Sequence, residues 1–117
     1  MPFFKRNRNQ VDDEGFVLVG GSEMVVVDEI VSVEVAGEPV IVTRWAGQVI
    51  AFSAYCPHAA ADLRDGGVRR GRVDCPEHDY RFDVVTGRAI WPPDEACRLK
   101  KYEVKESDGM VKVRSKQ

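Results

Sequence analysis

Short apolar runs separated by turn residues recur along the whole chain, and no window of a dozen residues shows the 3.6-residue period of a helix. Each run is only long enough for one short strand. The sequence therefore predicts an all-β fold. The expected strands lie at residues 17–19, 30–35, 40–45, 49–52, 82–85, 89–90, 102–105 and 110–113, with two shorter runs around Val68 and Val73.

Turn-forming residues separate these runs. The first run ends at Gly20-Gly21, and the later runs are divided by Ala36-Gly37-Glu38-Pro39, by Ala46-Gly47 and by Ser107-Asp108-Gly109. Glycine accepts the positive φ angles that tight hairpin turns require. We therefore expect the strands to form consecutive antiparallel hairpins.

Length and composition fit one soluble globular domain. The chain has 117 residues, of which 44% are hydrophobic and 31% charged, and it contains no repeat or linker. The formal charge of −2 argues against nucleic acid as a partner. We expect a flexible basic tail at residues 1–10 and a single domain at 11–117. No apolar segment is long enough for export or membrane insertion, so a cytoplasmic protein without a membrane partner is expected.

Metal-binding residue types gather in two short segments. Cys56-Pro57-His58 is followed, sixteen residues later, by Cys75-Pro76-Glu77-His78, and these contain both histidines and two of the three cysteines of the chain. Two loops of a β protein can bring such pairs together, so the spacing predicts one metal centre with four ligands. The third cysteine, Cys97, lies outside both segments and is expected to be a bystander. A Cys2His2 zinc site in an interaction domain remains an alternative, as does a degenerate domain without a cluster.

Cys-x-His followed by Cys-x-x-His resembles the ligand pattern of the Rieske iron–sulfur family. The resemblance covers roughly residues 15–115 and includes Arg81-Phe82-Asp83, Thr86-Gly87, Trp91-Pro92-Pro93, Leu99 and Tyr102. It implies a Rieske-type antiparallel β-sandwich with a small cluster-binding subdomain, at about residues 54–92, formed by two loops.

The same resemblance implies one [2Fe–2S] cluster per chain, with Cys56 and Cys75 on one iron and His58 and His78 on the other. The chain departs from the family at Ala60 and Asp79, where glycines with positive φ are frequent. Asp79 also places a carboxylate near the cluster, which disfavours reduction.

The function implied is that of a one-electron carrier. Both histidines are used by the cluster, and no residues remain for the catalytic domain of an oxygenase, so we do not expect an enzyme. The partners implied are a flavin-containing reductase and a terminal oxygenase, as for ferredoxin components of aromatic-ring dioxygenase systems. The small subunit of an assimilatory nitrite reductase is the alternative within the same family.

Overall fold

The computed structural model describes residues 11–116, so the basic tail predicted at residues 1–10 lies outside the described residues. Ten β-strands and two short 3-10 helices form this part of the chain, without an α-helix. The predicted all-β class is confirmed. Nothing in residues 11–116 forms a helix of the length and apolarity needed to cross a membrane.

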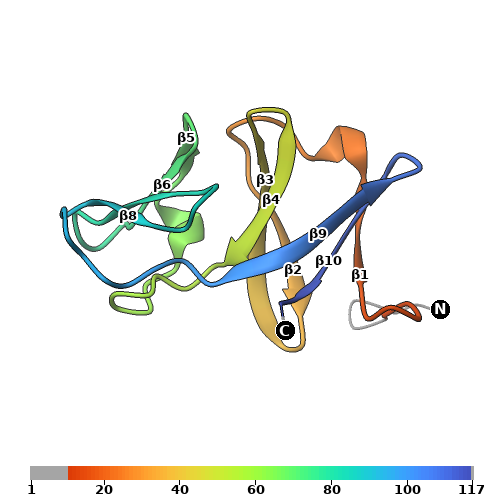
Figure 1. Cartoon of the computed structure of the whole chain (residues 1–117), viewed down its shortest axis with the longest axis horizontal. Helices are drawn as coiled ribbons and strands as arrows, with labels where there is room; N and C mark the ends of the chain where they lie inside the picture. The colour runs from red at the N-terminus through yellow and green to blue at the C-terminus, as the bar shows by residue number, and fades with distance from the viewer. Residues whose placement is uncertain (1–10, 117) are drawn as a thin grey trace.

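Two antiparallel sheets lie next to each other along the long axis of the molecule (Figure 1). The larger sheet has six strands, in the spatial order β1 (Val17–Gly21), β10 (Met110–Ser115), β9 (Lys101–Ser107), β4 (Gln48–Ser53), β3 (Glu38–Trp45) and β2 (Val31–Val35). The smaller has four, in the order β5 (Val68–Arg69), β6 (Arg72–Asp74), β7 (Arg81–Asp83) and β8 (Ala89–Trp91).

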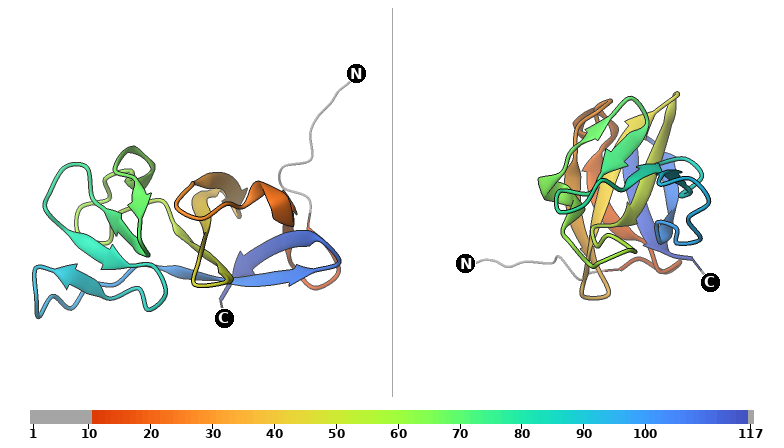
Figure 2. Two further views of the ribbon diagram at one scale, coloured as in Figure 1. Left: turned by 90° about the horizontal axis from the view of Figure 1, so that it is seen from above. Right: turned by 90° about the vertical axis from the view of Figure 1, so that its left-hand side faces the viewer.

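Two short 3-10 helices lie in the connections between strands. The 3-10 helix η1 (Ser22–Met24) follows β1, and η2 (Leu63–Asp65) lies on the path from β4 to β5. Figure 2 shows that the small sheet and its loops occupy one end of the molecule and the large sheet the other. The chain returns from the small sheet to the large sheet through the segment between β8 and β9.

Two-residue turns with positive φ at both positions close the hairpins of the large sheet. The pairs are Ala36-Gly37, Ala46-Gly47 and Asp108-Gly109, with φ between 52° and 82°. Such turns match the right-handed twist of the flanking strands, and glycine at the second position adopts this conformation without steric cost. The glycine-containing turns predicted between these strands are therefore present.

The structure differs from the predicted strand order at the N-terminus. β1 does not form a hairpin with the next strand but pairs with the last one, with Val17 opposite Val113. Two boundaries also differ. Glu38 and Pro39 already belong to β3, and Val84 and Val85 lie in a turn after β7. That turn forms because the carboxylate of Asp83 accepts hydrogen bonds from the backbone amides of Val85 and Thr86, at 2.8 and 3.0 Å.

Two groups of buried side chains hold the fold together. One lies on the large sheet, with Val25 of the segment after η1 packed in, and includes Val40, Val42, Val111 and Val113. The other spans both sheets: Ile41, Ile50 and Phe52 of the large sheet pack with a set from the small sheet and its loops, namely Cys56, Leu63, Val73, Cys75, Phe82 and Val84. The two cysteines predicted as ligands are thus part of the core that joins the sheets.

Candidate metal centre

The first ligand loop follows β4 and is closed by its own backbone. The amide of Cys56 donates to the carbonyl of Ala61 at 2.8 Å, and the amide of Ala60 donates back to the carbonyl of Cys56 at 2.7 Å. Ala60 closes this loop with a φ of 58°, the conformation that a glycine would adopt more easily. Ala60 therefore holds a backbone conformation that favours glycine.

The second ligand loop joins β6 to β7. The amide of Cys75 donates to the carbonyl of Tyr80 at 2.9 Å, which closes the loop over five residues. Asp79 is not among the described residues with positive φ, so this position does not need glycine. Gly66, which ends η2, packs tightly against the last residue of β6, because a Cβ built on Gly66 would lie 1.8 Å from the carbonyl oxygen of Asp74.

The two cysteines face each other beneath the surface. Their exposed fractions are 2% for Cys56 and 6% for Cys75, both side chains belong to the same buried cluster, and the two thiols interact electrostatically. Burial raises the pKa of the Cys56 thiol, and the neighbouring Cys75 raises it further. The backbone amides of His58 and Ala59 oppose this shift in pKa by hydrogen-bonding to the sulfur. A cationic metal centre is the partner that would hold both sulfurs as thiolates here.

The two histidines lie at the surface and are side by side. Both are exposed, their ring centres are 4.7 Å apart, and the rings are nearly perpendicular, at 84°. Imidazole nitrogens bind metals at about 2.0–2.1 Å, so two imidazoles on one ion must have their ring centres within a few ångströms of each other. The observed arrangement of His58 and His78 meets this requirement.

The four side chains therefore form two pairs, with thiols inside and imidazoles outside. A single zinc ion would need the four around one point, but residues 11–116 contain no group of three or more His, Cys, Asp or Glu side chains arranged around one ion. Two pairs fit a binuclear cluster, in which each iron takes two protein ligands and inorganic sulfide fills the other positions. The residues present thus fit a [2Fe–2S] group better than zinc.

Tyr80 is a residue of this site that the ligand pattern did not reveal. Its ring stacks on His58 with centres 3.9 Å apart and planes 15° apart. Its hydroxyl donates to Glu95 at 2.7 Å, and this hydrogen bond raises the pKa of Tyr80 to about 12. The same bond lowers the pKa of Glu95. Sequence reasoning had no signal for this contact, because the three residues come from three separate segments.

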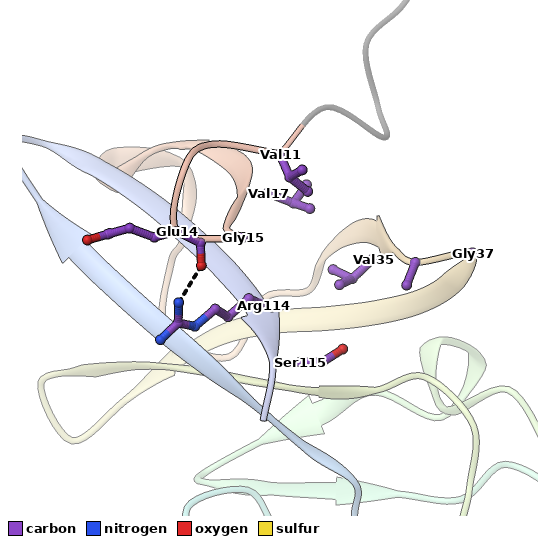
Figure 3. A pocket seen from close by; sticks show the side chains of 9 residues that line it. Val11, Glu14, Gly15, Val17, Val35, Gly37, Arg114 and Ser115 are labelled. Atoms are coloured by element: carbon purple, nitrogen blue, oxygen red, sulfur yellow. Dashed lines mark hydrogen bonds between the residues drawn. The ribbon is translucent and has the colours of Figure 1, made fainter. Parts of the chain in front are cut away.

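Other candidate residues lie around the site or far from it. Cys97 is half-buried beside the core that joins the sheets, and burial raises the pKa of its thiol. Trp91, in the segment that is part of the family resemblance, is 52% exposed. A cavity of about 580 Å³ lies at the other end of the molecule, where Arg114 donates to the carbonyl of Glu14 (Figure 3). No residue of the small sheet lines this cavity.

Comparison with known proteins agrees with this geometry. A Rieske [2Fe–2S] domain matches residues 15–108. The fold and this family match define an iron–sulfur electron-transfer domain. The chain belongs to the Rieske [2Fe–2S] domain family, and its cofactor is the [2Fe–2S] cluster.

Several relatives are ferredoxins of oxygenase systems. The ferredoxin component of the naphthalene 1,2-dioxygenase/salicylate 5-hydroxylase systems of a Ralstonia species is 35% identical over 77 residues, which are 66% of this chain and 73% of that protein. The ferredoxin of carbazole 1,9a-dioxygenase from Nocardioides aromaticivorans superposes with a TM-score of 0.76 at 29% identity, over 86% of this chain and 98% of that chain.

A further solved structure is described as a complex of reduced oxygenase and oxidized ferredoxin in carbazole 1,9a-dioxygenase. One of its chains superposes with a TM-score of 0.78 at 27% identity, over 90% of this chain and 99% of that chain. The predicted Rieske fold is confirmed by these comparisons.

Proposed function

We propose that Cys56 and Cys75 bind the inner iron of the cluster as thiolates, and that His58 and His78 bind the outer iron. The observation that carries this assignment is the separation of the four side chains into a buried thiol pair and an exposed imidazole pair. The subdomain that holds the cluster is then residues 54–92, which contain both ligand loops and the small sheet.

The cluster supplies reversible one-electron chemistry when bound. Two neutral imidazoles in place of two anionic thiolates make reduction easier, and they favour the outer iron as the site of the added electron. The chain's own contribution is to keep water from the sulfurs by burying both cysteines, and to hold both imidazoles at the surface. Electrons enter and leave beside His58 and His78.

In this proposal the protein is the ferredoxin of a multicomponent oxygenase system. It receives one electron from a flavin-containing reductase and passes it to a terminal oxygenase, and it catalyses no reaction of its own. The named relatives support this role, since they are ferredoxin components of dioxygenase systems. We place the protein in the cytoplasm with its partners. The uncharged exposed residues Pro57, which precedes His58, and Trp91 are the expected contacts for both partners.

The ligand assignment is tested by iron and acid-labile sulfide analysis of purified protein. We expect about two irons and two sulfides per chain in the wild type, and loss of the cluster in Cys75→Ala, because nothing nearby replaces that thiolate. Cys97→Ser is the matched control and should keep the wild-type iron and sulfide content. A wild-type visible spectrum in Cys75→Ala, or cluster loss in Cys97→Ser, would show that the ligand set is wrong.

A further inference from the structure

The His58 ring is held by an unusual kind of contact. Histidines that bind metals are normally oriented by a hydrogen bond from their second ring nitrogen to a carboxylate, a carbonyl or water. Within residues 11–116 no protein group forms such a hydrogen bond with the His58 ring. The contacts that remain are the Tyr80 ring stacked on its face and the His78 ring against it.

Tyr80 itself is fixed at both ends. Its hydroxyl donates to one carboxylate oxygen of Glu95 at 2.7 Å, and the other oxygen accepts the amides of Ala96 and Cys97 at 3.1 and 3.5 Å. On its inner side the Tyr80 ring stacks on Phe82, with centres 6.1 Å apart, and Phe82 is fully buried. A continuous row of three rings therefore connects the exposed imidazole of His58 to the core.

We infer that Tyr80 is a positioning residue for His58, and that Glu95 holds Tyr80 in place. The inference rests on the proposed role of His58 as an iron ligand. The torsion that turns an imidazole about its Cβ–Cγ bond is broad, so a ligand histidine whose ring has no hydrogen-bond partner in the protein would adopt a range of ring planes. The parallel Tyr80 ring, 15° from the plane of His58, restricts that range. The orientation of the imidazole at the electron exit is thus set by the second ligand loop and by the segment after β8.

Three substitutions separate the parts of this arrangement. Tyr80→Leu removes the ring, Tyr80→Phe keeps the ring but removes the hydroxyl, and Glu95→Gln keeps an acceptor for the hydroxyl without the charge. Tyr55→Leu is the matched control, because Tyr55 is an exposed tyrosine beside the first ligand loop whose ring stacks on neither histidine. Iron and sulfide are measured first in every variant, and wild-type protein without a cluster would refute the proposed function rather than this inference.

The readout is the electron paramagnetic resonance spectrum of the dithionite-reduced protein, together with the histidine nitrogen couplings measured by electron–nuclear double resonance. A spread of His58 orientations broadens both. We expect Tyr80→Leu to keep two irons and two sulfides with broadened lines, Tyr80→Phe to give a smaller broadening, and Glu95→Gln and Tyr55→Leu to match the wild type.

Wild-type linewidths in Tyr80→Leu would overturn the inference. If Tyr80→Leu does not retain its cluster, Tyr80→Phe and Glu95→Ala test the inference instead, since both keep the aromatic ring and remove only the hydrogen bond between residues 80 and 95. Broadened lines in these two variants, with the wild-type spectrum in Glu95→Gln, support the inference. Unbroadened lines in both overturn it.

Discussion

Gly66 ends η2 and packs against the end of β6, just before Cys75, so an added methyl group there should push the two segments apart. Its φ of −96° is accessible to alanine, so backbone conformation does not require glycine. Space does require it. A Cβ at this position would be 1.8 Å from the carbonyl oxygen of Asp74 and 3.1 Å from the Pro76 ring, on either side of the ligand Cys75.

The size of the effect follows from these distances. Real Cβ atoms do not approach within 3.0 Å of another heavy atom, so the backbone at Asp74 must retreat by more than about 1 Å. Overpacking of a core costs about 1–3 kcal/mol, and a clash with backbone belongs at the upper end of that range. A loss of about 3 kcal/mol lowers the Tm of a domain of this size by roughly 12 °C. The same displacement moves the Cys75 sulfur away from Cys56.

Gly67→Ala is the matched control in the same loop. It adds the same methyl group into open space, and its φ of +90° costs about 1–2 kcal/mol in backbone strain. Iron and sulfide content and thermal unfolding are measured for both variants. We expect Gly66→Ala to lose most of its cluster and Gly67→Ala to keep it. Full cluster content in Gly66→Ala, with a Tm no lower than that of Gly67→Ala, would refute the reasoning.

Three further predictions concern other parts of the molecule. Ala46→Asn should raise the Tm by about 2–4 °C, because asparagine tolerates the φ of 54° better than alanine; an unchanged or lower Tm would contradict the turn argument. Asp12 has its pKa lowered to about 2, first by the amide of Phe16 and then by Lys112, so its charged form stabilises the fold above the unfolded-state pKa of 3.8. Asp12→Asn should therefore lower the Tm at pH 7, and the difference from wild type should shrink as pH falls from about 4 to about 2; an equal difference at pH 7 and pH 2 would contradict this. The reduction potential at pH 7 should lie near the low end of the Rieske range, at roughly −150 mV, because hydrogen bonds to the cluster sulfurs raise the potential and few donors are expected here. Phe82 has no donor, the Tyr80 hydroxyl donates to Glu95 instead, and Asp79 adds a negative charge. A midpoint above about +100 mV would exclude this ferredoxin role.

The local features of the fold could be predicted because they depend on neighbouring residues. Ala46-Gly47 and Asp108-Gly109 form the expected hairpin turns, and the strands beside them follow. The pairing of β1 with β10 could not be predicted, because it joins residues almost a hundred positions apart. Val84 and Val85 read as a strand by hydrophobicity, but hydrogen bonds from the amides of Val85 and Thr86 to the Asp83 carboxylate form a turn instead.

The proposed ligand set comes from spacing, residue type and family resemblance and stays a prediction, and the structure places its two histidines side by side. The environment of these residues could not be predicted from the sequence. Of the two positions without glycine, only Ala60 adopts positive φ, and nothing in the sequence distinguishes it from Asp79. The contacts of Tyr80 with His58 and Glu95 depend on how three separate segments pack, which residue spacing does not encode.

If the proposed ligands hold the cluster, the burial of the cysteines and the exposure of the histidines make the histidine side its approach. In the proposed role, the reductase and the oxygenase must therefore dock on the same few residues around His58 and His78. The protein cannot act as a bridge that holds both at once. It must leave the donor before it meets the acceptor, so each electron is carried by diffusion, and neither partner can bind so tightly that release limits the cycle.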